Sequence, residues 1–144
     1  MTVKTKNKTL SDGVAYEANP AYTREEYTLR NTTGSTVGVT NPMLMPVNIT
    51  GGKAELAVAG GEAGIDGLLL TSEDIDEVAT ANDYPGGKRA FLVRGPAIIR
   101  KSMLPANDAE DAAFTIADIV TRLAALSPPI LCHTEPAETT TQVE

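Results

Sequence analysis

Cys132 and His133 are neighbours in the sequence, and they are the only cysteine and the only histidine among the 144 residues of the chain. Nucleophilic catalysis requires a nucleophile and a base within hydrogen-bonding distance of each other. The run that contains the pair, residues 130–133, predicts a short strand, in which neighbouring side chains point to opposite faces. One cysteine and one histidine are also too few for a standard zinc site. We therefore expect no catalytic residue, no bound metal and no cofactor.

Acidic side chains gather at Glu73, Asp74, Asp76 and Glu77. Hard cations such as Ca²⁺ take several oxygen ligands, but this run lacks the glycine and the spacing of an EF-hand loop. The glycines at 60–67 are not followed directly by a helix, as the glycines of a phosphate-binding loop would be. A solvated acidic loop and tight turns are the interpretations that we favour.

The formal net charge of −7 and the isoelectric point near 4.7 make this an acidic chain. An acidic surface repels nucleic acid and anionic lipid headgroups, so neither nucleic acid nor a membrane is an expected partner. Aromatic residues make up only 4% of the chain, which disfavours a binding site built from stacked rings. The polar start of the sequence lacks the apolar stretch of a secretory signal, so we expect the chain to be made and kept in a cytoplasmic compartment.

Residues 41–133 are predicted to form a compact body of short strands. Glycine and proline divide this part into apolar runs at 41–47, 54–59, 67–71 and 89–100. One helix is signalled, with Asp108 as its N-cap and a stop at 127–129, because its apolar residues recur every three or four positions. A final strand follows at 130–133. The expected fold class is α+β, a small, mostly β body with one main C-terminal helix.

Residues 1–40 are polar, rich in threonine and asparagine, and without sustained periodicity, so we predict an extended N-terminal arm. Within it, Tyr27 and Leu29 alternate with polar residues, which predicts a short strand that needs a sheet edge to receive it. The candidate contact residues of the arm are Glu25, Tyr27, Leu29 and Arg30. Residues 134–144 are predicted to be a flexible acidic tail.

The order of these elements resembles that of the lambda-like head decoration proteins, or capsid cement proteins, of tailed bacteriophages. The resemblance covers about residues 41–133. It rests on Asn-Pro-Met-Leu-Met-Pro-Val at 41–47, Gly-Leu-Leu-Leu-Thr at 67–71, the segment 91–105, and the helix followed by Ile130 and Leu131.

This resemblance implies a non-enzymatic protein that sits as trimers on the outside of the expanded capsid, at three-fold and quasi-three-fold positions. There it would clamp major capsid protein subunits against the pressure of the packaged DNA. The N-terminal arm of such proteins adds a strand to the capsid protein, and the polar arm predicted here suits that role. Three-fold symmetry requires two different patches of one subunit to fit each other. As a hypothesis, we assign Met43, Met45, Ile98 and Arg100 to this trimer contact.

Two other classes of protein remain open. Another small β-rich virion adaptor or tail-associated binding module would have the same turns and arm, but it would bind a different site and need not form trimers. An enzyme would require a polar cluster that the single histidine and single cysteine do not supply.

Overall fold

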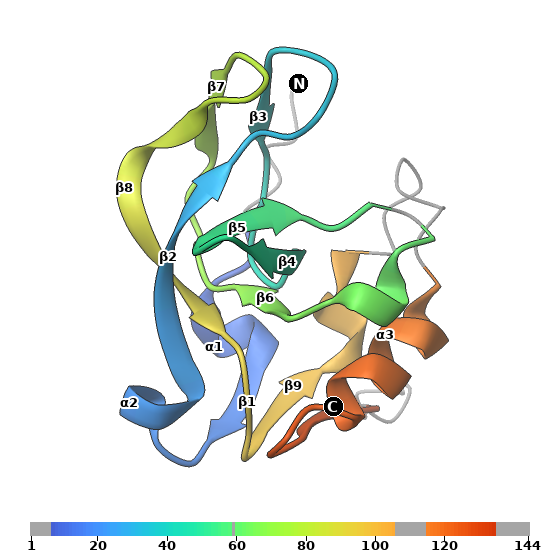
Figure 1. Cartoon of the computed structure of the whole chain (residues 1–144). Coiled ribbons are helices and arrows are strands. Elements are labelled where there is room, and N and C mark those ends of the chain that lie inside the picture. Colours follow the sequence, from blue (N-terminus) through green and yellow to red (C-terminus); the bar gives the residue numbers. More distant parts are fainter. Residues whose placement is uncertain (1–6, 59, 106–114, 135–144) are drawn as a thin grey trace, which may run out of the picture.

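The computed structural model describes residues 7–58, 60–105 and 115–134 (Figure 1). The strands are β1 (Val14–Glu17), β2 (Arg24–Arg30), β3 (Val37–Val39), β4 (Pro46–Thr50), β5 (Lys53–Leu56), β6 (Gly67–Leu69), β7 (Ile75–Val78), β8 (Asp83–Leu92), β9 (Ala97–Arg100) and β10 (Ile130–His133). The helices are α1 (Leu10–Gly13), α2 (Pro20–Thr23) and α3 (Ile116–Ala124), with short 3₁₀ turns η1 (Glu62–Gly64) and η2 (Lys101–Met103).

Five strands close into a barrel in the order β2-β5-β4-β6-β8. Each of these strands directs at least one apolar side chain into the interior, where Leu29, Val47, Ala54, Leu69 and Phe91 are fully buried. The short β3–β7 pair contributes Val39 and Ile75 to the same core. The pairings of these five strands close the barrel within this chain.

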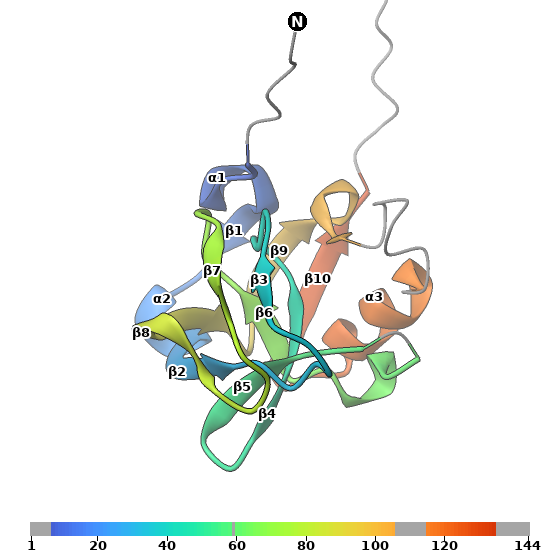
Figure 2. The same cartoon turned by 90° about the horizontal axis from the view of Figure 1, so that it is seen from above.

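The second sheet has three strands in the order β1-β9-β10, with β1 antiparallel and β10 parallel to β9 (Figure 2). Its inner face packs with α3 against the outside of the barrel. Ile99 and Ile130 of the sheet, Ile119 of α3, and Leu68 and Leu92 of the barrel are all completely buried in this second core.

The apolar run at 67–71 owes its lack of alternation to its position between the two cores. Leu68 faces the core beneath the three-stranded sheet, whereas Leu69 faces the barrel interior. A strand buried on both faces reads as a continuous apolar segment. The sequence pattern therefore predicts this strand correctly.

The segment Pro85-Gly86-Gly87, which reads as a loop in the sequence, lies inside β8. The register of pairing between β8 and β2 shifts here: Lys88 is paired with Thr28, whereas Asp83 is paired with Arg30. Gly86 and Gly87 have φ angles of 106° and 74°, which suit glycine and place a β-bulge in the strand.

The prediction of an extended arm over 1–40 is wrong for residues 7–40. This part of the chain forms α1, β1, α2, β2 and β3, and all three strands pair with strands of the body. Residues 1–6 lie outside the described residues. The polar composition suggested an arm because few side chains of residues 7–40 are buried, and the strand partners of this segment lie far along the chain and leave no local signal.

The fold class is confirmed, because strands dominate and the helices are few and short. The main helix begins at Ile116 after Thr115 as N-cap, later than the sequence suggests, and Asp108 lies outside the described residues. The final strand is confirmed as β10. Of the predicted tail, Thr134 alone is described, and residues 135–144 lie outside the described residues.

Candidate docking surface

The residues with the most reactive side chains do not form a catalytic site. Cys132 is half-buried against the core, while His133 is exposed, as expected for neighbours in a strand. Burial raises the pKa of the Cys132 thiol to about 11, which keeps it protonated and unreactive at neutral pH. Among the described residues, no group of three or more histidine, cysteine or acidic side chains is placed to hold a metal ion.

Asp74, in the acidic run at 73–77, is hydrogen-bonded to Asn7 and Asn41. Asp74 Oδ1 accepts hydrogen bonds from the backbone N–H of Asn41, at 2.9 Å, and from Asn7 Nδ2, at 2.6 Å. The two bonds hold the pKa of Asp74 below its usual value, and the bond from Asn41 has the larger effect. The carboxylate is thus occupied by protein donors.

A cavity of about 440 Å³ lies between η1 and α3. Two polar side chains in the wall of this cavity, Glu62 and Arg122, form hydrogen bonds that hold α3 in place. Glu62 Oε1 accepts the backbone N–H of Thr115 at the start of α3, at 3.0 Å, and Arg122 Nε donates to the carbonyl of Ile65 at 2.8 Å. The Thr115 bond is the main reason that the pKa of Glu62 lies below its usual value. We therefore interpret Glu62 and Arg122 as residues that stabilise the position of α3.

The residues predicted to form the partner-binding strand belong to the barrel wall. β2 lies between β5 and β8: residues 24–28 and Arg30 pair with β8, and residues 28–30 pair with β5. Leu29 is fully buried, and Tyr27 packs against Phe91 with ring centroids 6.0 Å apart. The predicted alternation is confirmed, but β2 is a strand of the barrel wall, which corrects the assignment of Glu25, Tyr27, Leu29 and Arg30 to a free arm.

Glu25 and Arg30 also have partners within the chain. Glu25 accepts hydrogen bonds from the Tyr27 hydroxyl and from Arg94, which lower its pKa in that order. Arg30 Nη2 donates to the carbonyl of Ala81 at 3.2 Å. These contacts fasten β2 to the body.

The four residues assigned to a trimer contact do not form one patch. Met43 is 1% exposed in the core beneath the three-stranded sheet, so it is not a surface residue, and its assignment is corrected. Met45 is half-buried and lines a groove with Pro46, Leu56 and neighbouring residues. Ile98 and Arg100 are half-buried on the outer face of β9.

The outer face of the three-stranded sheet carries an uninterrupted apolar row. Tyr16 of β1 is paired with Ile98 of β9, which is paired with Leu131 of β10. Tyr16 is 54% exposed and Leu131 is 52% exposed. Tyr16 and Leu131, two of the four large apolar side chains that are exposed in the described part of the chain, thus lie on either side of Ile98. An aligned apolar row on a surface is typical of an interaction site.

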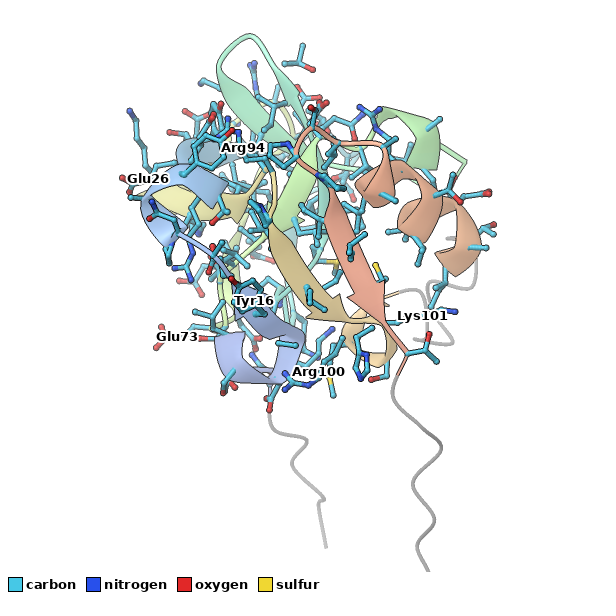
Figure 3. All side chains as sticks on the ribbon, turned by 90° about the horizontal axis from the view of Figure 1, so that it is seen from below. Tyr16, Glu26, Glu73, Arg94, Arg100 and Lys101 are labelled. Atoms are coloured by element: carbon cyan, nitrogen blue, oxygen red, sulfur yellow. The ribbon has the colours of Figure 1, made fainter. Side chains whose placement is uncertain are left out.

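A row of polar residues lies beside this apolar row on the three-stranded sheet. Arg100 of β9 is paired with His133 of β10, and Lys101 begins η2 directly after Arg100. In Figure 3, Tyr16 lies at the β1 side of this sheet, and Arg100 and Lys101 lie where β9 and β10 end. We call the surface formed by Tyr16, Ile98, Leu131, Arg100 and His133 the outer sheet face.

Sequence reasoning named Ile98 and Arg100 but missed Tyr16 and Leu131. The alternation at 130–133, with Ile130 and Cys132 inward, was a usable signal for Leu131. No local signal marks Tyr16, because its exposure depends on the pairing of β1 with a strand more than 80 residues further along the chain.

No helix among the described residues is long and apolar enough to span a bilayer. No protein family model, curated protein or solved structure matches the chain.

Proposed function

We propose that this chain is a capsid decoration protein that binds the exterior of the expanded head of a tailed bacteriophage. It binds the major capsid protein as trimers at three-fold and quasi-three-fold positions and stabilises the shell against the pressure of the packaged DNA. It performs no chemistry. The protein is made in the host cytoplasm and resides on the outer surface of the virion.

One observation carries the proposal: the separate segments on which the family resemblance rests pack together in a single core. Met43 from the Pro-Met-Leu-Met-Pro run, Leu68, Leu92, Ile119 of α3 and Ile130 of the last strand all belong to the core beneath the three-stranded sheet. Their order in the sequence thus corresponds to a shared packing unit.

Two further observations favour a binding protein over an enzyme. The titratable side chains described above brace loops and helix ends, while the most prominent exposed feature is the apolar row Tyr16, Ile98 and Leu131. A trimer would present three such surfaces at once. Linked contacts raise the effective concentration of each later contact, so weak single contacts give tight overall attachment.

The test is cosedimentation of the purified chain with decoration-free expanded heads of the matching phage. Because each three-fold position takes a trimer, we expect saturation at about one copy for each major capsid protein subunit. Saturation at only a few copies per head would favour a tail or portal adaptor. Absence of binding would refute the decoration proposal.

A further inference from the structure

One edge of β2 is open over part of its length. β8 pairs with this strand from Arg24 onward, whereas β5 pairs only with its last part, residues 28–30. The first part of β2, residues 24–27, therefore has a neighbouring strand on one side only. In Figure 1 this part runs along the left margin of the molecule, between α2 and β5.

The hydrogen bonds of β8 show which backbone groups of β2 face the open edge. The Ala90 carbonyl accepts the N–H of Leu70 at 3.1 Å, so it points away from β2. Ala90 is paired with Glu26, which therefore directs its own N–H and C=O away from β8. The bond from the Val93 N–H to the Thr23 carbonyl, at 3.0 Å, fits the same alternation at the start of the strand.

Four backbone groups line this edge without a hydrogen-bond partner among the described residues. They are the C=O of Arg24, the N–H and C=O of Glu26, and the N–H of Thr28. The N–H of Arg24 is already used, because it donates to the carbonyl of Pro20 at the end of α2. Along the edge the four groups alternate between acceptor and donor, and an extended backbone presents the complementary groups at the same spacing.

The side chain of Glu26 indicates the chemistry of a strand that would fit here. Glu26 is exposed, forms no ion pair with a described residue, and points away from the molecule in Figure 3. A cross-strand neighbour of opposite charge stabilises such a pairing, so a lysine or arginine suits the position beside it. The strands at the ends of the two smaller sheets of this chain, β1, β3, β7 and β10, contain neither residue. Charge complementarity therefore favours a strand from a different protein over one from a second copy.

We propose that the open edge of β2, residues 24–28, receives an extended strand of the major capsid protein that carries a lysine or arginine side chain beside Glu26. This inference rests on the proposed function and names the contact by which the chain attaches. Backbone hydrogen bonds hold the added strand, and the ion pair with Glu26 fixes its register. The barrel keeps its own pairing, because the added strand bonds to groups that β5 and β8 leave unused.

The experiment measures binding of the full chain and its variants to decoration-free expanded heads. Glu26→Pro removes the N–H that faces the open edge and keeps the bonds between β2 and β8, because a sheet edge tolerates proline where the N–H faces solvent. We expect it to weaken binding by about tenfold or more, since the partner strand loses a bond and meets the proline ring. Glu26→Thr is the matched control, because it keeps the N–H and suits a strand, and it is expected to weaken binding by less than about fivefold.

Glu26→Lys and Glu73→Lys test the charge of the partner strand. Both variants replace an exposed carboxylate by an ammonium group, and Glu73 lies in the loop before β7. Glu26→Lys is expected to weaken binding at low salt, and its difference from wild type should shrink as the salt concentration is raised. Glu73→Lys is expected to bind within about twofold of wild type. Equal effects of the two variants would overturn the assignment of a basic side chain beside Glu26.

Hydrogen exchange tests the same edge without any substitution. Amides of peptides that cover residues 24–28 are expected to exchange more slowly in the head-bound chain than in the free chain, because the N–H groups of Glu26 and Thr28 become bonded. Peptides that cover the exposed loop 32–36 serve as the control. Unchanged exchange at 24–28 would overturn the proposal even if Glu26→Pro fails to fold.

The outcomes separate this inference from the proposed function. Wild-type affinity of a Glu26→Pro variant with unaltered thermal unfolding, for heads that the wild-type chain saturates, would overturn the open edge as the docking site and leave the decoration role standing. Failure of the wild-type chain to bind would overturn both. A wild-type trimer in sedimentation velocity that Glu26→Pro converts to monomers would assign the edge to contact between copies, which also overturns the proposal.

Discussion

Two tyrosines of the barrel wall differ in how their hydroxyl groups are satisfied. The Tyr27 hydroxyl donates to Glu25. Tyr84 is 2% exposed, and its hydroxyl has no hydrogen-bond partner among the described residues, so burial raises its pKa. An unsatisfied buried hydroxyl costs free energy that a phenyl ring avoids.

We therefore expect Tyr84→Phe to leave the free energy of unfolding unchanged or to raise it by about 1 kcal/mol. Tyr27→Phe, which makes the same chemical change where the hydroxyl is bonded, is expected to lower it by about 0.5–1.5 kcal/mol. Urea denaturation of the two variants checks the pair. Greater destabilisation by Tyr84→Phe than by Tyr27→Phe would contradict this account of the barrel interior.

Glu17 makes the best-connected ion pair of the fold. Its Oε1 lies 2.6 Å from Arg24 Nη2, and it also accepts a hydrogen bond from the Thr23 hydroxyl. Burial acts to raise the pKa of Glu17, but the bonds from Arg24 and Thr23 outweigh it, so the pKa lies below 4.5. A carboxylate with a lowered folded-state pKa stabilises the fold above about pH 4.5, and this contribution is lost as the pH falls through the folded-state pKa.

Glu17→Gln is therefore expected to cost about 1–2 kcal/mol at pH 7, and the difference from wild type should shrink toward pH 3. Urea unfolding at the two pH values measures it. The exposed neighbour Glu26→Gln serves as the control and is expected to change stability by less than about 0.5 kcal/mol. A Glu17→Gln cost that is the same at both pH values would show that its charge is not the cause.

Individual elements were predicted where the signal is local. The alternation at Tyr27 and Leu29 and the apolar run at 67–71 both identify strands. The partners of these strands could not be predicted, because β2 pairs with β5 and β8, which lie far downstream, and pairing leaves no mark on the strand itself. Of the outer sheet face, the sequence identified Ile98 and Arg100. It could not identify Tyr16 and Leu131, because only the pairing of β1 and β10 with β9 brings them beside Ile98.

Gly95 shows how closely the β8–β9 connection approaches the start of β10. A Cβ atom at this position would lie 1.8 Å from the carbonyl oxygen of Pro129, and the Gly95 N–H donates to the carbonyl of Pro128 at 2.8 Å. We expect Gly95→Ala to destabilise the fold by about 2–4 kcal/mol or more, because backbone must move. Gly34→Ala, where a Cβ meets nothing within 4 Å, is the control and should be nearly neutral in thermal unfolding. Equal melting temperatures for the two variants would contradict the close approach.

At the scale of the whole molecule, the N-terminal third is part of the folded body. Removing residues 1–40 would delete a barrel strand and the edge strand β1, so we expect the product not to fold. Removing residues 1–6 deletes none of the described elements, so this shorter truncation is the control and is expected to keep a cooperative unfolding transition. A cooperative unfolding transition in the truncated 41–144 protein would show that the body folds without β2, which would contradict the role of β2 as a strand of the closed barrel.

The central claim is that this chain decorates a phage head, and its location on the shell tests the claim most directly. The measurement is a cryo-electron microscopy difference map between expanded heads with and without the bound protein. We expect trimeric density at the three-fold and quasi-three-fold positions of the outer surface. Added density confined to the portal or tail vertex, or no added density on the shell, would contradict the account.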